Sequence, residues 1–195
     1  MTGTVGAGKT AVAEALGDLL TQRGVPHAVI DVDWLRRSWP SPPGDPFNGG
    51  ITLRNLRAVA RNFLHDGARL LVLAGVVESR AERDGYQDAI GVPLTACRLA
   101  TSVETVRERL RQRHRDDPAG LAWHLERCGT LDRILREAAV EDVVVDGGHG
   151  SPAEVAEAVA GICRIDGRQT SPAETVRTDA PAGDPRSRGG RGGCA

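Results

Sequence analysis

The sequence is almost without lysine. Lys9 is the only lysine among its 25 basic residues, and the others are arginine. A GC-rich coding bias accounts for the arginines, but a bias this strong leaves lysine only where arginine would fail. Arginine carries a wide planar fork, whereas lysine carries a compact charge on a slim stem. The sequence therefore predicts that Lys9 is a chemical requirement.

Other absences restrict the class of protein. The net charge is −1 over 195 residues, so no overall field attracts nucleic acid or a membrane. No apolar run approaches the roughly 20 residues that span a bilayer, and the N-terminus is glycine-rich and unlike a signal peptide. The four cysteines are scattered without a CxxC pair, at Cys97, Cys128, Cys163 and Cys194. We therefore expect a reduced cytoplasmic protein with no nucleic-acid or membrane partner.

Lys9 lies in a glycine-rich motif at the start of the chain. The segment Gly3-Thr4-Val5-Gly6-Ala7-Gly8-Lys9-Thr10 is a full match to G-x-x-x-x-G-K-[ST]. Glycines let such a loop turn its backbone N–H groups inward around phosphates, and the following helix points its positive end at them. The lysine of the motif reaches the β- and γ-phosphates, and the hydroxyl ligates Mg²⁺. The predicted cofactors are therefore ATP and Mg²⁺, bound by Gly3, Gly6, Ala7, Gly8, Lys9, Thr10 and Ala11.

Chance and context both favour this interpretation. Completion of the motif by accident around a single lysine has a frequency of about one in several hundred. Ala11 to Arg23 has the periodicity of an amphipathic helix that ends at Gly24. A phosphate-binding loop normally follows a buried strand, and Met1 stands where that strand should end. We expect the annotated start to lie downstream of the true one, or else a sheet without its first strand.

The rest of the chain alternates strand-like and helical segments, which predicts an α/β fold with a parallel sheet. Predicted strands are 27–32, 69–77, 94–100 and 142–146; predicted helices begin at Trp34 and cover 51–65, 78–90, 102–113, 121–138 and 152–163. A Pro/Gly-rich loop, 38–50, is long enough to cover a substrate. The predicted domain is 1–165, and the Gly, Pro and Arg-rich stretch 166–195 is predicted to be a disordered tail.

Two carboxylates end the first predicted strand. Ligands in doubly wound sheets bind outside the carboxyl ends of strands, where Asp31 and Asp33 fall. One carboxylate can orient Mg²⁺, and the other can accept the proton of an attacking hydroxyl. The alternative is that a strand-end Asp only caps the following helix. For Asp33 we favour a functional role over the helix cap. For Asp31 both interpretations stay open: a residue that binds Mg²⁺ and substrate, or a helix cap.

At these residues the chain resembles a family. Gly3–Thr10 and Asp31-Val32-Asp33-Trp34-Leu35-Arg36 are similar to the P-loop and D-x-D-x-[IL]-R segments of adenylylsulfate kinases, and gluconate and shikimate kinases share a similar D-x-D. The segment 74–84 also resembles the stretch after their third strand. The resemblance implies a three-layer α/β/α P-loop fold with strand order 2-3-1-4-5, an ATP donor and a mobile lid at about 113–120. By position it implies that Asp33 is the base and that Arg36 and Arg80 hold the acceptor.

Two departures from the family pattern carry consequences. Trp34 replaces the asparagine usual in adenylylsulfate kinases, which speaks against adenylylsulfate as the acceptor. The strand at 70–74 has no Walker B aspartate, which leaves Thr10 and the Asp31/Asp33 pair as the evident Mg²⁺ anchors.

Arginines crowd the predicted lid at positions 107, 109, 111, 113 and 115. Guanidinium groups can follow the charge on a transferring phosphoryl group as a lid closes. Alternate positions cannot share one helical face, so we expect Arg107 and Arg111 to be solvated and Arg113 and Arg115 to be catalytic. By resemblance, Arg109 would stack on the adenine.

Two weaker candidates complete the set. Arg54, on the predicted helix 51–65, could face an anionic acceptor, although a solvated helix face explains the spacing equally well. His149 follows the last strand, where it could reach the adenine. The sequence therefore predicts an ATP-dependent kinase that phosphorylates a hydroxyl group of a small molecule. The alternatives are a nucleoside monophosphate kinase-like enzyme and a nucleotide-binding regulatory protein without efficient turnover.

Overall fold

The strands of the protein form two parallel pairs. In the computed structural model, which describes residues 1–165, β1 (His27–Asp31) pairs with β2 (Leu70–Ala74), and β3 (Cys97–Ala100) pairs with β4 (Val143–Asp146). In both pairs the strands are in register along their whole length. All four carboxyl ends therefore point to the same edge, where the loops that follow them can meet.

Met1 and Thr2 join the two pairs. The Met1 carbonyl accepts a hydrogen bond from the Gly75 N–H (3.1 Å), next to the end of β2. On the other side, the Thr2 N–H donates to the Cys97 carbonyl in β3 (2.8 Å). These two residues lie where the first strand of the predicted order would run. Because Thr2 makes only an isolated bridge and no strand forms there, the order 2-3-1-4-5 stays a prediction.

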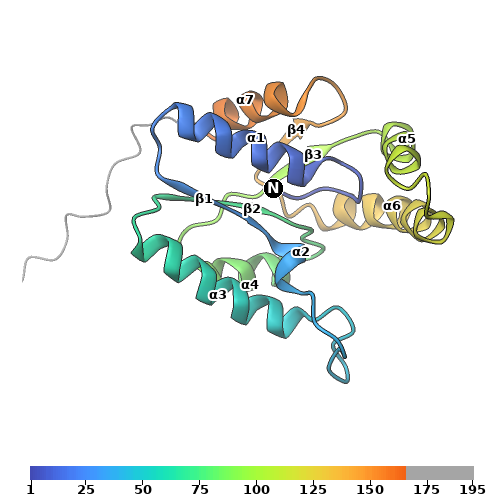
Figure 1. Cartoon of the computed structure of the whole chain (residues 1–195), viewed down its shortest axis with the longest axis horizontal. Coiled ribbons are helices and arrows are strands. Elements are labelled where there is room, and N and C mark those ends of the chain that lie inside the picture. The colour runs from blue at the N-terminus through green and yellow to red at the C-terminus, as the bar shows by residue number, and fades with distance from the viewer. Residues whose placement is uncertain (166–195) are drawn as a thin grey trace, which may run out of the picture.

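Helices cover both faces of the strands (Figure 1). α1 (Lys9–Gln22) and α7 (Pro152–Ile162) pack together on one face, and α3 (Gly49–His65) and α4 (Arg80–Ile90) pack together on the other. α1 turns one side inward, where Val12, Leu16 and Leu20 are almost fully buried. The predicted three-layer α/β/α class is confirmed, with a separate apolar cluster on each face.

A helical hairpin projects beside the sheet at its carboxyl edge. α5 (Val103–Arg113) and α6 (Pro118–Ala138) pack on each other, and Val106, Leu110 and Cys128 form a small core between them. The predicted lid, 113–120, coincides with the turn of this hairpin. α6 starts earlier than predicted because Asp117 caps it, accepting a hydrogen bond from the Gly120 N–H (2.9 Å).

The remaining predicted elements have counterparts whose ends differ by at most three residues, including the short α2 (Val32–Leu35). The tail prediction for 166–195 lies outside the described residues, and the domain boundary at 165 stays a prediction. In the part of the chain that is described, no helix has the length and apolar character of a membrane span.

Candidate functional site at the carboxyl edge of the strands

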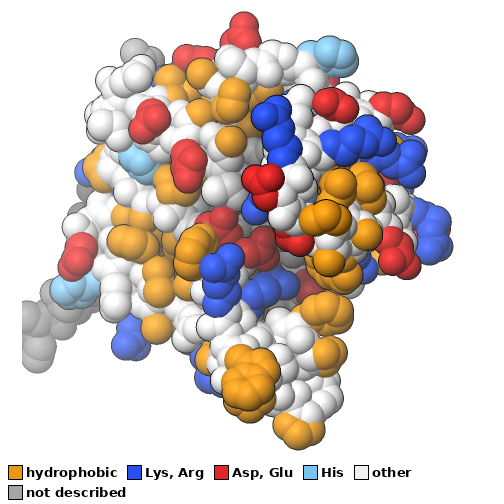
Figure 2. Space-filling model, turned by 45° about the vertical axis from the view of Figure 1, so that its right-hand side comes forward, with side chains coloured by type: hydrophobic (Ala, Val, Ile, Leu, Met, Phe, Trp, Pro, Cys, Tyr) orange, Lys and Arg blue, Asp and Glu red, His pale blue; other side chains and the backbone are white. Residues whose placement is uncertain are grey.

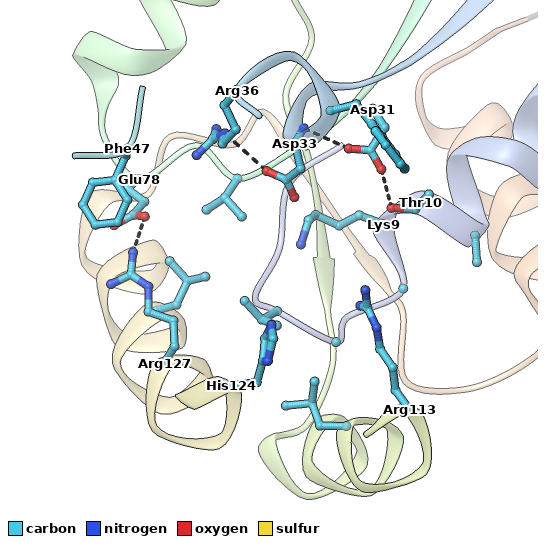
Figure 3. A pocket seen from close by; sticks show the side chains of 18 of the residues that line it. Lys9, Thr10, Asp31, Asp33, Arg36, Phe47, Glu78, Arg113, His124 and Arg127 are labelled. Carbon is cyan, nitrogen blue, oxygen red and sulfur yellow. Dashed lines mark hydrogen bonds and ion pairs between the residues drawn. The ribbon is translucent and has the colours of Figure 1, made fainter. Parts of the chain in front are cut away.

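A cavity of about 1080 Å³ opens at the carboxyl edge of β1 and β2. Its walls come from the loop before α1, the end of β1 with α2, the start of α4, and the hairpin α5–α6. Figure 3 shows the charged side chains of these elements pointing toward one another across the opening. Segments far apart in the sequence therefore supply one site, as expected for a parallel sheet.

The loop before α1 is shaped to take an anion. Gly6 and Gly8 have positive φ angles of 82° and 94°, in the region that side chains with a Cβ rarely adopt. Gly8 is also the N-cap of α1, and neither a side-chain cap nor an acidic residue occupies the first turn of that helix. The N–H groups of this turn lack intrahelical acceptors and lie at the positive end of the helix dipole. A phosphate group satisfies both requirements.

Lys9 rests on this loop. Its Nζ donates to the carbonyl oxygens of Gly3 and Thr4, each at 3.0 Å. Burial lowers the pKa of Lys9 from 10.5 to about 8, although the nearby carboxylates of Asp33 and Asp31 favour the charged form. At about pH 8 the amine of Lys9 is therefore close to half protonated. Negative charge placed beside it would raise its pKa and make it fully protonated.

Asp31 organises the residues beside Lys9. One of its carboxylate oxygens accepts from the Asp33 N–H (2.9 Å) and caps α2, and the other accepts from the Thr10 hydroxyl (2.9 Å). The capping alternative is thus present together with a contact to the phosphate-binding loop. Among the described residues no group of three or more His, Cys, Asp or Glu side chains is arranged to hold a metal ion. Thr10 and Asp31 fit Mg²⁺, which keeps waters and is bound through one or two side chains plus phosphate oxygens.

Asp33 faces the cavity with its carboxylate exposed. Its nearest charged partner is Arg36, whose Nε lies 3.5 Å from Asp33 Oδ1. Arg36 also donates to the hydroxyl of Tyr86 in α4 (3.3 Å). Burial raises the pKa of Tyr86, so this hydroxyl stays protonated and neutral. Asp33 is therefore positioned by α2 and oriented by Arg36, and retains a free oxygen toward the opening (Figure 3).

Arg109 ties the phosphate-binding loop to the end of the sheet. Its guanidinium donates to the carbonyls of Ala7 (3.3 Å) and Gly147 (3.0 Å). It therefore bridges the phosphate-binding loop and the loop after β4, and its stacking on the adenine stays a prediction. His149 takes no part in this bridge: its side chain is 92% exposed and pairs with Asp146 at 2.7 Å.

The structure brings most of the predicted site residues to this cavity. The predicted residues that line it are Gly6, Gly8, Lys9, Thr10, Ala11, Asp31, Asp33, Arg36, Arg109 and Arg113. Predicted residues that do not line it are Gly3, Ala7, Arg54, Arg80, Arg115 and His149. Gly3 and Ala7 are buried within the loop, whereas the other four are exposed. Their predicted roles stay predictions that this cavity does not support.

Several residues that line the cavity were not predicted from the sequence, among them an ion pair and a set of aromatic side chains. In the ion pair, Arg127 of α6 donates to Glu78, just before α4, at 2.5 Å. The aromatic side chains are Trp34, Phe47 and Trp123. Arg127 and Trp123 lie four residues apart on one helix, but nothing in that spacing shows that this face looks into a cavity. Only the packing of the hairpin decides it.

Comparison with known families identifies this arrangement. Residues 1–122 match the sequence profile described as adenylylsulphate kinase. The chain belongs to the adenylylsulphate kinase family. A curated relative in this family, a probable adenylyl-sulfate kinase from Aeropyrum pernix, is 31% identical over 131 residues, which are 62% of this chain. The chain spans 64% of the length of that relative.

Several solved structures have a fold similar to that of this chain. A tunicamycin resistance protein from Deinococcus radiodurans has a TM-score of 0.58 at 22% identity, over 83% of this chain and 92% of the other. A gluconokinase from Sinorhizobium meliloti has a TM-score of 0.54 at 23% identity, over 84% of this chain and 90% of the other. A shikimate kinase from Acinetobacter baumannii, in complex with shikimate, has a TM-score of 0.55 at 18% identity, over 84% of this chain and 90% of the other. The resemblance to P-loop small-molecule kinases drawn from the motifs is confirmed.

Proposed function

We propose that this member of the adenylylsulphate kinase family is an ATP-dependent kinase that transfers the γ-phosphoryl group to a hydroxyl group of a small molecule. The observation that supports it best is the convergence of Lys9, Thr10 and Asp33 on one cavity from two separate elements. A nucleotide-binding protein needs only the first two residues. A carboxylate opposite them is what a hydroxyl acceptor requires.

The donor half of the cavity binds and orients the triphosphate. The uncapped first turn of α1 and the glycine loop would hold the phosphates, while Lys9 leaves the carbonyls of its own loop for the β- and γ-phosphate oxygens. Thr10 and Asp31 would hold Mg²⁺, which supplies neutralisation of charge on the phosphate oxygens. Arg113, which reaches the cavity from α5, adds a second cation on the opposite side (Figure 3).

The acceptor half holds the nucleophile. Asp33 would accept the proton of the attacking hydroxyl, and Arg36 fixes the direction of the carboxylate. Because phosphoryl transfer needs little covalent chemistry from the protein, alignment and charge stabilisation supply most of the acceleration. The hairpin α5–α6 closes one side of the cavity and reduces access of water to the transferred group.

The test is acceptor-dependent consumption of ATP by the purified chain, with adenylylsulphate as the first acceptor because of the family's name. Asp33→Asn removes the base and keeps the shape, so turnover should fall by a factor of about 10² to 10⁴ while the Kd for ATP stays within about twofold. Lys9→Ala should abolish both binding and turnover. Asp18→Asn, an exposed position on α1 outside the cavity, is the matched control.

Two results would contradict the proposal. The first is acceptor-dependent turnover that survives Asp33→Asn, which would remove the base from the mechanism. The second is tight ATP binding with no turnover on any hydroxyl compound, which would favour a nucleotide-dependent binding protein instead.

A further inference from the structure

Aromatic side chains line the cavity with unusual exposure. The chain has three Trp, one Tyr and two Phe residues. Three of these six line the cavity, and their exposed fractions are 65% for Trp34, 66% for Phe47 and 56% for Trp123. Tyr86 is the only one of the six that the described part of the chain buries in its core. Exposed apolar groups in a concave site mark a surface that a ligand covers.

The three side chains come from three different parts of the fold. Trp34 belongs to α2, Phe47 to the loop before α3, and Trp123 to α6 on the hairpin. Figure 2 shows apolar side chains on both sides of a hollow in which acidic and basic side chains meet. In Figure 3, Phe47 is seen on the side of the cavity where the ion pair of Glu78 and Arg127 lies. These three side chains, which we call the aromatic wall, therefore line one cavity from separate elements and are not the surface of one amphipathic helix.

The cations of this half are already engaged by the protein itself. Arg36 lies 3.5 Å from Asp33, and Arg127 lies 2.5 Å from Glu78. The guanidinium carbon of Arg37 lies 4.0 Å from the ring centroid of Trp34, in a cation–π contact. To pair with Arg36 or Arg127, a carboxylate or sulfate on the acceptor would have to compete with Asp33 or Glu78, and to pair with Arg37 it would have to share that cation with the Trp34 ring. An uncharged ring does not compete with these carboxylates, and it can stack on Phe47 or Trp123, or on Trp34 in place of Arg37.

Carboxylates also match the cations in number. Asp33, Glu78 and Glu82 line this half together with Arg36, Arg37 and Arg127, so these six side chains sum to no net charge. The other charged residues of the lining are three cations (Lys9, Arg109 and Arg113) and two carboxylates (Glu14 and Asp31), so the unmatched positive charge lies on the side of the triphosphate. The electrostatic design therefore separates a positively charged half, which takes the triphosphate, from a neutral acceptor half.

From this geometry we infer that the acceptor is an uncharged hydroxyl compound that carries an aromatic or heteroaromatic ring. The inference rests on the proposed kinase function and names its acceptor class. The ring stacks among Trp34, Phe47 and Trp123, which brings a hydroxyl on its substituent to Asp33. In the transfer, the acceptor oxygen forms a bond to the γ-phosphorus, the bond to the β–γ bridging oxygen breaks, Asp33 takes the hydroxyl proton, and ADP leaves.

Binding is tested separately from turnover by tryptophan fluorescence of the ADP-saturated protein, since ADP blocks the nucleotide half. Adenosine and adenylylsulphate form a matched pair with the same ring and different charge. Adenosine, uridine and a phenicol-type aryl diol should quench the fluorescence saturably, and at least one should bind about tenfold more tightly than adenylylsulphate, gluconate or shikimate. Trp34→Phe or Trp123→Phe should remove part of the quenching. Absence of saturable quenching by every ring compound overturns the inference, whether or not the chain is a kinase.

Kinetics then tests the aromatic wall. With the best neutral acceptor, Phe47→Ala and Trp123→Ala should each raise the KM for the acceptor about tenfold, with the KM for ATP unchanged. Trp39→Ala is the control, because Trp39 is 92% exposed and does not line the cavity. A kcat/KM for adenylylsulphate, gluconate or shikimate above that of every neutral ring compound would refute the acceptor class while leaving the kinase function intact. If ring compounds bind saturably but no acceptor in the panel stimulates ATP consumption, the kinase function is refuted and the neutral aromatic site is kept.

Discussion

Nucleotide binding should change the protonation of Lys9. Burial lowers the pKa of this lysine to about 8 in the free protein, so its amine carries about half a proton at pH 8. Phosphate oxygens at hydrogen-bond distance favour the charged amine and raise its pKa again. Binding of ATP should therefore take up about 0.1 proton at pH 7, about 0.5 at pH 8 and about 0.9 at pH 9.

The sign of the affinity change follows from the same linkage. The complex binds more protons than the free protein, so affinity falls as the pH rises through the pKa of about 8. Between pH 7 and pH 9 the protonated fraction of Lys9 in the free protein falls about tenfold, and the affinity should fall by the same factor. ATP itself contributes little to this uptake at pH 8, because its phosphates are then fully ionised.

Calorimetric titration measures the proton number directly. ATP is titrated in EDTA, so that no metal competes for the phosphates, in Tris and in a phosphate-free buffer of different ionisation enthalpy at each pH. The slope of observed enthalpy against buffer ionisation enthalpy gives the protons taken up. Lys9→Arg is the control, since a guanidinium stays charged and should give a slope of zero if the variant binds. A slope of zero for the natural chain at both pH 8 and pH 9 would refute the reasoning that burial holds the amine near its midpoint.

Two further predictions concern the metal and the scaffold. Thr10→Val removes the hydroxyl that donates a hydrogen bond to Asp31. The Mg²⁺ concentration for half-maximal activity should then rise about tenfold or more, while the affinity for ATP in EDTA stays unchanged. An unchanged Mg²⁺ dependence would exclude Thr10 as a ligand. Arg83 donates to both carboxylate oxygens of Asp142, at 2.9 and 2.7 Å. Arg83→Ala should lower the free energy of unfolding in urea by about 2–3 kcal/mol, whereas Arg61→Ala, exposed on α3, should change it little.

The secondary structure was largely predictable because local patterns specify it. The apolar spacing that buries Val12, Leu16 and Leu20 is visible in the chain itself, and so are the strand-like runs that became β1 to β4. The first strand is different. Its place is taken by Met1 and Thr2, whose hydrogen bonds to both strand pairs follow no local pattern.

The candidate site divides in the same way. The motif around Lys9 and the position of Asp33 at a strand end were sufficient to predict that both face one cavity. Arg113 and Arg115 looked equivalent in the sequence, but only Arg113 lines the cavity. Arg113 is the last residue of α5, whereas Arg115 lies in the turn before α6, and the packing of the hairpin, not arginine spacing, decides which of them reaches the cavity.

By itself, the sequence determined the chemistry of the donor half: a glycine loop, the single lysine of the chain, and a hydroxyl, all within eight consecutive residues. A site made of neighbouring residues can be predicted from the sequence, because the backbone between these residues is short and the motif fixes its geometry. Tertiary structure alone decided the acceptor half. Trp34, Phe47 and Trp123 are separated in the chain and line one cavity only because α2, the loop before α3 and α6 converge at the edge of the sheet. Local sequence does not encode that convergence, because it results from packing between elements.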